Sequence, residues 1–243
     1  MAKLSGKVAL ITGGNKGIGK GIAKAFAEEG AALIITARGA GELQQTAREL
    51  AAGGNRVMGI PADVSDEDHV QELFAVTVQE FGRLDILVNN AGAFDGGPLD
   101  ELATEAWDRV IAVNLRAPFL CTRAAMRIMK RQRGGRIIKI GSISAQRVRP
   151  HSAPYSASKH GLWGLTQVTA LEGREFGISC SCLHPGNVRV ERRQESNKAI
   201  DQEPMMTMEE LAETAVLMAS LPPHVNMLEA IVLPVEQLYL GRG

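Results

Sequence analysis

The chain of 243 residues lacks the charge imbalance that is typical of nucleic-acid-binding proteins. Lysine plus arginine number 27 and aspartate plus glutamate number 27, so the formal net charge is zero. No acidic or basic tail is present to attract a charged macromolecule. No apolar run approaches the roughly 20 residues of a transmembrane helix, and no signal segment precedes the first strand. We therefore expect a soluble, cytoplasmic protein that binds neither membrane nor nucleic acid.

Cysteine is also scarce, and it offers neither a disulfide framework nor a metal site. Cys121, Cys180 and Cys182 are an odd number and have no metal-ligating residues in company. Two of them lie within an apolar strand pattern, where a thiol behaves as a small hydrophobic group. We expect three buried free thiols. Internal repeats, low-complexity tracts and linkers are absent as well, so residues 1–243 are predicted to form a single domain.

What the chain does have is a regular alternation of short apolar runs and segments of helical periodicity. The expected strands are residues 8–12, 32–36, 56–60, 84–88, 136–140, 178–183 and 230–233. The expected helices are residues 18–29, 42–52, 66–81, 104–113, 118–131, 156–176 and one that starts near 207. Ser65 is the expected cap of the third helix, and Thr207 with Glu210 forms a capping box. This alternation indicates an α/β fold, with a parallel sheet covered by helices on both faces.

A glycine-rich loop joins the first strand to the first helix and reads Thr12-Gly13-Gly14-Asn15-Lys16-Gly17-Ile18-Gly19. Glycines let the backbone approach a pyrophosphate, and the helix N-terminus behind them offers free N–H groups. The predicted cofactor-binding residues here are Gly13, Asn15, Lys16, Gly17, Ile18 and Gly19. A glycine-rich turn without a ligand is the alternative, because the spacing G-x-x-x-G-x-G differs from the common dinucleotide fingerprint.

The end of the second strand favours NADP(H) over NAD(H). NAD-binding proteins of this kind usually carry a carboxylate about 20 residues after the glycine loop. No carboxylate occurs between Glu29 and Glu42, and Arg38 stands in the expected place. A guanidinium can bind a 2′-phosphate through two hydrogen bonds, and Lys16 adds a second cation. The alternative is that both cations are ordinary solvated charges.

Two later loops follow the carboxyl ends of strands, where open α/β sheets bind ligands. Asp63 and Val64 follow the third strand and are placed to meet the adenine edge of a dinucleotide. Asn90, Ala91 and Gly92 follow the fourth strand, and their small size lets a ring lie against the backbone. We include these five residues in the predicted cofactor site.

Tyr155 and Lys159 are four residues apart, so on a helix they share one face. A free phenol has a pKa of about 10, and a neighbouring ammonium favours its ionised form. A hydroxyl from Ser142 is then available to help Tyr155 hold a substrate oxygen. Taken alone, a tyrosine and a lysine at this spacing are more often an ordinary helix surface than a catalytic pair.

The ordered set of motifs resembles that of the short-chain dehydrogenase/reductases. The set consists of the glycine loop, Asn89-Asn90-Ala91-Gly92, Ser142 thirteen residues before Tyr155, Tyr155-x-x-x-Lys159, and Pro185-Gly186. Each motif is weak, but their order and spacing are specific and span nearly the whole chain. The resemblance implies a Rossmann-type, doubly wound, mostly parallel sheet of seven strands.

The resemblance also implies roles for individual residues. Tyr155 would be the catalytic acid/base, Lys159 would assist it and bind the nicotinamide ribose, and Ser142 would position the substrate oxygen. Asn114 would hold a water in a proton relay, and this role rests on the resemblance alone. Pro185, Gly186 and Val188 would join Tyr155 and Lys159 in contacting the cofactor. A homodimer or homotetramer, packed through helices near 100–130 and 156–176, is implied as well.

The implied function is that of an NADP(H)-dependent oxidoreductase acting on a ketone or aldehyde, with 3-oxoacyl reduction as one option. The alternatives are a non-catalytic NADPH-binding regulator or scaffold, and an epimerase or dehydratase of a longer related group, for which too few residues follow the last strand. The expected substrate pocket is bounded by residues 93–99, 145–153 and the segment after 186. We interpret the arginines of these segments as solvated loop charges rather than as a site for an acidic substrate, and both interpretations remain open. His151 and His184 are interpreted as loop or pocket-wall residues.

Three positions depart from the family pattern. Val190 stands where a threonine that binds the carboxamide is common. Gly141 stands where a second serine is common, a change that we expect to be harmless. Residues 233–237 replace the frequent Asp-Gly-Gly ending, and we expect this tail to pack differently, at a subunit contact.

Overall fold

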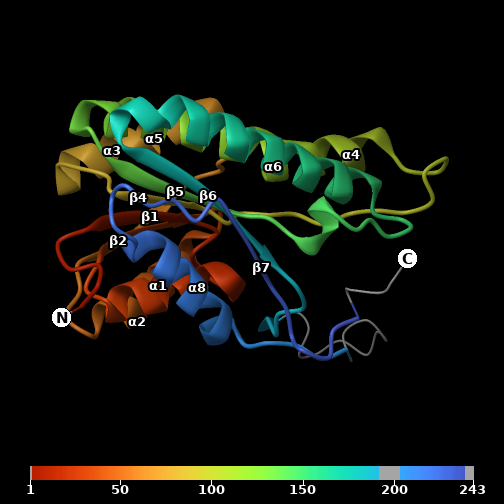
Figure 1. The fold of residues 1–243 in the computed structure, drawn as a ribbon, viewed down its shortest axis with the longest axis horizontal. Helices are drawn as coiled ribbons and strands as arrows, with labels where there is room; N and C mark the ends of the chain where they lie inside the picture. The colour runs from red at the N-terminus through yellow and green to blue at the C-terminus, as the bar shows by residue number, and fades with distance from the viewer. Residues whose placement is uncertain (1, 192–202, 239–243) are drawn as a thin grey trace.

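A parallel sheet of seven strands forms the central layer of the molecule (Figure 1). The computed structural model describes residues 2–191 and 203–238. The strands are β1 (Val8–Thr12), β2 (Ala32–Ala37), β3 (Val57–Pro61), β4 (Ile86–Asn89), β5 (Gly135–Ile140), β6 (Ile178–Pro185) and β7 (Glu229–Val232). They lie in the order β3-β2-β1-β4-β5-β6-β7, and every pairing between them is parallel. The winding reverses between β1 and β4, which places a ligand-binding crevice at the carboxyl ends of these strands.

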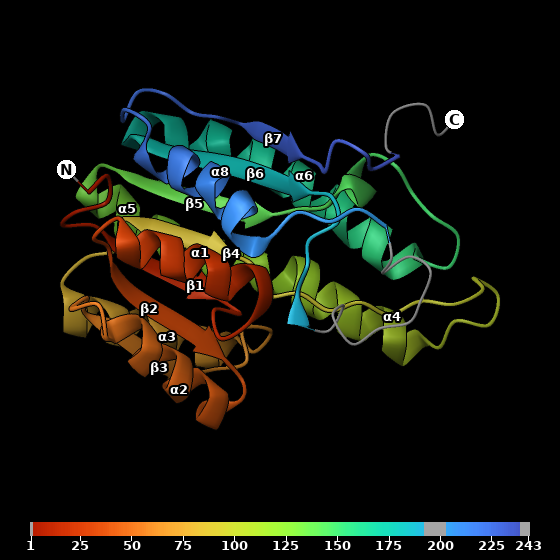
Figure 2. The same ribbon diagram turned by 90° about the horizontal axis from the view of Figure 1, so that it is seen from below.

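Helices cover both faces of the sheet, as predicted (Figure 2). One face carries α1 (Gly17–Glu28), α2 (Ala40–Ala51) and α8 (Met208–Ser220). The other carries α3 (Glu67–Phe81), α5 (Ala117–Gln132) and α6 (Ala153–Gly173), with α4 (Thr104–Ile111) beyond the carboxyl ends of the strands. The described residues also contain three short turns: η1 (Ala112–Arg116), η2 (Ile143–Ala145) and η3 (Arg174–Phe176). The doubly wound fold is therefore confirmed.

The sheet separates two hydrophobic cores, and alternate residues of each strand enter one or the other. In β1, Ala9 and Ile11 belong to the core under α1 and α8, whereas Val8 and Leu10 belong to the core under α3 and α5. This alternation follows from the two-residue period of a strand. It explains why a strand covered on both faces has a continuous apolar sequence.

The capping predictions have different outcomes at the two helices. Thr207 Oγ1 accepts from Glu210 N at 3.1 Å and the Glu210 carboxylate accepts from Thr207 N at 2.7 Å, so the capping box of α8 is confirmed. The predicted Ser65 cap of α3 is wrong. Asp66 is the cap, with its carboxylate accepting from His69 N at 3.0 Å. Ser65 instead donates its hydroxyl to Asp63 at 2.7 Å.

Two helix boundaries also differ from the sequence prediction. Helix α6 begins at Ala153 rather than at residue 156, because Pro154 has no N–H to lose in the first turn. The expected break between residues 113 and 118 is absent. Helices α4 and α5 are continuous through η1, a π turn in which hydrogen bonds span five residues instead of four.

The three cysteines are free and buried, as expected. Burial raises the pKa of Cys121 and of Cys182 to about 12. Within residues 2–191 and 203–238, no helix has the length and apolar character needed to cross a bilayer.

Candidate active site

The glycine loop is tied to the loop after β4. The side-chain amide of Asn90 donates to the carbonyl oxygens of Thr12 and Gly13 at 2.9 and 3.1 Å. In return, Thr12 Oγ1 accepts from the backbone N–H groups of Asn90 and Ala91, both at 3.0 Å. A Cβ on Gly19 would lie 2.2 Å from the Gly13 oxygen, so only glycine fits there. The Asn90 side chain therefore shapes the loop, and its predicted contact with a cofactor would come from elsewhere on the residue.

The N-terminus of α1 already holds an anion from the same chain. Helix α1 has no side-chain cap, and Gly17 N donates to both carboxylate oxygens of Glu191, at 3.1 and 3.3 Å. The side chain of Val190 lies against Gly17 as well. A carboxylate is favoured here by the free N–H groups and by the positive end of the helix dipole. The predicted pyrophosphate position therefore receives the Glu191 carboxylate in this structure.

The other predicted cofactor residues on this side gather at the ends of β1, β2 and β3. Asn15 is buried and donates to Glu42 at 2.6 Å, which fastens the glycine loop to α2. Arg38 is exposed at the end of β2. The pKa of Asp63 is lowered mainly by the hydroxyl hydrogen bond from Ser65, and the positive charge of Arg38 adds to this effect. Arg38 and Asp63 therefore share one corner of the crevice. Lys16, in the glycine loop, is exposed, and Ile18, in the first turn of α1, is half-buried. Val64 is buried in the core.

Asn114 lies in the π turn and is almost fully buried. Its Oδ1 accepts from Ala93 N at 2.7 Å, and its Nδ2 donates to Ala93 O at 2.9 Å. The same Nδ2 reaches Ser158 Oγ at 3.2 Å, and Ser158 in turn donates to the carbonyl of Tyr155 at 2.7 Å. The wide turn therefore points this amide at both the loop after β4 and the first turns of α6. Gly92 lies within this loop, close to the Asn114 amide.

Lys159 and Tyr155 lie together on α6, as their spacing predicted. Lys159 is buried, and its Nζ donates to the carbonyl of Ile140 at 2.8 Å. This Nζ lies 5.5 Å from the centroid of the Tyr155 ring. On the outer side, Phe94 meets the Tyr155 ring edge-on, with 5.2 Å between centroids. The half-buried phenol therefore lies between a cation from the interior and an exposed aromatic ring.

Ser142 lies two residues beyond Ile140, which ends β5 and whose carbonyl holds Lys159. Its Oγ accepts from Ser144 N at 3.1 Å. A hydroxyl has one proton and two lone pairs, so this contact leaves the O–H free to donate. The structure thus brings all four predicted catalytic residues onto adjoining segments: the end of β5, the π turn and the start of α6.

The loop after β6 is held by the C-terminal tail. Gly186 N donates to Val232 O, and Asn187 N donates to the side-chain oxygen of Gln237, both at 2.8 Å. Pro185 ends β6, and Val188 pairs with Met206. Gln237 belongs to the tail that was expected at a subunit contact. In the structure it supports the predicted cofactor loop of its own chain.

Sequence reasoning did not identify several residues that shape the site. Ser158 lies inside the Tyr155-x-x-x-Lys159 motif, but no sequence signal marks its bond to Asn114. Gly161 accommodates Leu115 of the same chain: a Cβ there would lie 3.0 Å from that side chain. Gly164, by contrast, faces open space.

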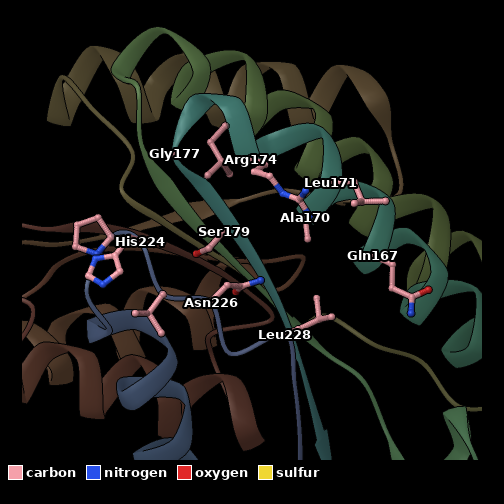
Figure 3. A pocket seen from close by; sticks show the side chains of 12 residues that line it. Gln167, Ala170, Leu171, Arg174, Gly177, Ser179, His224, Asn226 and Leu228 are labelled. Carbon is pink, nitrogen blue, oxygen red and sulfur yellow. The ribbon is translucent and has the colours of Figure 1, made fainter.

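A cavity of about 730 Å³ lies away from these residues (Figure 3). Its walls come from the C-terminal half of α6, the start of β6 and residues 223–228. Ile178 lines the cavity, whereas Pro185 stands at the opposite end of the same strand. With a rise of about 3.3 Å per residue, the two are roughly 23 Å apart. The cavity is therefore separate from the candidate active site.

Comparisons with known proteins identify a family model, relatives and solved structures that match this chain. The model of a family described as short chain dehydrogenase matches residues 7–201. The chain is 36% identical to the D-beta-hydroxybutyrate dehydrogenase of Cupriavidus necator, over 88% of this chain and 83% of that protein. It is 35% identical to the 3-oxoacyl-(acyl-carrier-protein) reductase of a Synechocystis species, over 81% and 80%. A solved structure of a Serratia marcescens short-chain dehydrogenase/reductase mutant has a TM-score of 0.89 and 35% identity, covering 95% of this chain and 98% of that one.

Proposed function

Because the chain belongs to the short-chain dehydrogenase/reductase family, we propose that it transfers a hydride between NADP(H) and a ketone or aldehyde. The observation that carries the proposal is the pairing of Lys159 with Tyr155. A buried ammonium held by a backbone carbonyl lies 5.5 Å from the ring of a half-buried phenol. An arrangement that buries a lysine beside a tyrosine at the mouth of a crevice suits proton transfer better than it suits a surface helix.

The residues divide the work as follows. Ser142 donates a hydrogen bond from its hydroxyl to the substrate oxygen and orients the carbonyl. Tyr155 gives a proton to the same oxygen during reduction and removes it during oxidation. Lys159 supplies positive charge beside the phenol, and Asn114 links the π turn to α6 and anchors the proton path. The reduced nicotinamide, when bound, supplies the hydride.

The choice of NADP(H) over NAD(H) rests on the corner formed by β2 and the glycine loop. Arg38 offers a guanidinium to a 2′-phosphate, and Lys16 is the second cation of that corner. The Glu191 carboxylate on Gly17 supports the view that the α1 N-terminus attracts the pyrophosphate. The remaining predicted contacts, Asp63 to the adenine and Ala91 to the cofactor ring, are part of the same proposal.

The substrate entrance exposes three large apolar side chains beside the exposed Arg147 and Arg149. Phe94, Leu99 and Val148 are 60%, 74% and 66% exposed on the two segments that were expected to bound the pocket. These segments meet where Gly96 passes the carbonyl of His151. An apolar substituent on the carbonyl compound would cover these side chains. Relatives named for 3-oxoacyl and hydroxybutyrate substrates make a 3-oxoacyl compound the first candidate.

The test is Tyr155→Phe, which removes one oxygen and leaves the ring contacts with Phe94 in place. We expect the turnover of a ketone panel with NADPH to fall by about 10²- to 10⁴-fold, the usual contribution of general acid–base catalysis. NADPH binding, followed by fluorescence, should stay within about twofold of the wild type, since most of the predicted cofactor contacts belong to other residues. A variant with near wild-type turnover would refute the assignment. A wild-type protein that binds NADPH but reduces no carbonyl would favour the regulator alternative.

We also propose that the protein is a cytoplasmic homo-oligomer. Phe119 on α5 and Val168 and Leu171 on α6 are 44%, 50% and 60% exposed on neighbouring helices. Burying such side chains in a subunit contact is favourable. Three unpaired thiols fit a reducing compartment. Light scattering of the purified protein should give a mass of at least two chains.

A further inference from the structure

His184 lies beside Ser142, where β5 and β6 run next to each other. It is 1% exposed, and its Nδ1 lies 2.8 Å from the carbonyl oxygen of Ser142 and 3.3 Å from the Ser142 nitrogen. We propose that His184 is a positioning residue that holds the Ser142 peptide, and through it the hydroxyl, in the geometry that catalysis needs. The inference rests on the proposed role of Ser142.

The contacts around the Ser142 carbonyl identify which imidazole nitrogen carries the proton. This oxygen accepts from Ala145 N at 2.9 Å, which uses one of its two lone pairs. The Nδ1–H of His184 fills the second, since its 2.8 Å contact is shorter than the alternative 3.3 Å contact with the amide. Burial lowers the pKa of His184, so near neutral pH the ring has a single N–H. That proton is on Nδ1.

The other ring nitrogen supports the same conclusion. Within the described residues, Nε2 of His184 has no hydrogen-bond partner. Glu229 Oε1 lies 3.3 Å away, close enough for an ion pair but outside hydrogen-bond geometry, and it is engaged by Gln146 at 2.6 Å. A buried polar atom without a partner is destabilising. The histidine is therefore poorly explained by stability alone, and its one good hydrogen bond is to Ser142.

The absence of a side chain at Gly141 leaves room for the His184 imidazole. A Cβ on residue 141 would lie 2.5 Å from Nδ1 and 2.8 Å from Cε1 of His184. The glycine that departs from the family pattern is therefore required by the histidine. Gly141 N also donates to Leu183 O at 2.7 Å. The sheet ladder thus fixes the peptide between Ile140 and Gly141, and His184 fixes the peptide that follows Ser142.

A matched pair of variants tests the Nδ1 contact. His184→Asn places an amide N–H near the position of Nδ1, whereas His184→Gln places one near Nε2. Because a shift of about 1 Å in a catalytic group can reduce the rate up to 10²-fold, we expect at least a tenfold loss of kcat in the glutamine variant. The asparagine variant should stay within about threefold, and KM for NADPH should change little in both. Equal kcat values for the two variants, or an effect confined to KM for NADPH, would overturn the proposal.

A double-mutant cycle separates this proposal from the function on which it rests. If the wild type reduces no carbonyl compound, the proposed function fails. If the wild type is active and Ser142→Ala keeps full activity, the role proposed for Ser142 fails, and the inference about His184 fails with it. If Ser142→Ala is impaired, adding His184→Gln should cause little further loss, because both changes act on the same hydroxyl. A further tenfold loss in the double variant would mean that His184 acts independently of Ser142.

Gly141→Ala gives a second route in case the glutamine variant does not fold. Its methyl group would displace the imidazole, so the expected kcat loss is the same, and wild-type kcat would overturn the proposal. Long-range ¹H–¹⁵N correlation spectra of the wild type should show a protonated Nδ1 and a bare Nε2. The opposite tautomer would contradict the geometry directly.

Discussion

Removing the guanidinium of Arg38 tests the cofactor preference. Arg38 is exposed at the end of β2 and helps to lower the pKa of Asp63 across the crevice. A hydrogen bond to a charged group contributes about 1.5–3 kcal/mol. Since about 1.4 kcal/mol corresponds to a factor of ten, Arg38→Ala should raise KM for NADPH by roughly 10- to 150-fold. NADH has no 2′-phosphate, so its KM should stay within about twofold.

The assay is steady-state reduction of one ketone with each cofactor, at low and at high salt. Because Arg38 is exposed, the wild-type preference for NADPH should shrink as salt screens the contact. Arg48→Ala is the matched control, since Arg48 is exposed in the last turn of α2. It lies about 12 Å along the helix from Ala40, which exceeds the Debye length of about 8 Å at physiological salt. Equal changes with the two cofactors, or no change with NADPH, would refute the reasoning.

Three further predictions concern stability and reactivity. Thr207→Ala removes the cap of α8 and should lower the free energy of unfolding by about 1 kcal/mol, or Tm by roughly 2–4 °C, in a thermal melt; an unchanged Tm would mean that the capping box does not contribute. A thiol reagent at pH 8 should leave Cys121 and Cys182 unmodified until guanidinium unfolds the chain, because their pKa values are about 12. Ser65→Ala should raise the pKa of Asp63 toward its usual value. A carboxyl whose pKa is lower in the folded state stabilises that state above its unfolded pKa, and this stabilisation is lost on acidification. In urea melts, the wild type should therefore have a higher free energy of unfolding than the variant near neutral pH, and the two values should converge in acid.

Much of the fold follows from local patterns, and the exceptions have identifiable causes. The strands are recognisable because a sheet covered on both faces needs continuous apolar runs. The cap of α3 cannot be recognised from the sequence, because Ser65 and Asp66 are both good caps and the choice depends on where the backbone turns. The π turn cannot be predicted from local sequence either, because its Asn114 side chain forms hydrogen bonds with Ala93 and Ser158, which are distant in the sequence.

Some contacts of the candidate site can be predicted from the sequence, and others depend on the tertiary fold. Tyr155 and Lys159 share a helix, so their spacing alone predicts that they lie together. The contact between His184 and Ser142 spans 42 residues, and it exists only because β5 pairs with β6 in the register that sets Ile140 beside Leu183. No local pattern contains that register. Sequence motifs therefore identify the reacting groups, whereas the groups that orient them depend on strand pairing.

The wide turn at Ala112–Arg116 has a consequence for how this chain can vary. A π turn is a regular helix with one residue too many, and such insertions are rare because an ordinary helix is usually more favourable. Deleting a single residue there would let α4 and α5 merge into one uninterrupted rod, and the deletion would rotate the Asn114 amide away from Ala93. The shorter chain would then gain helical regularity and lose the link that Asn114 makes between the loop after β4 and helix α6. Natural length variation is therefore expected to avoid this turn, even though it lies in the middle of a long helix.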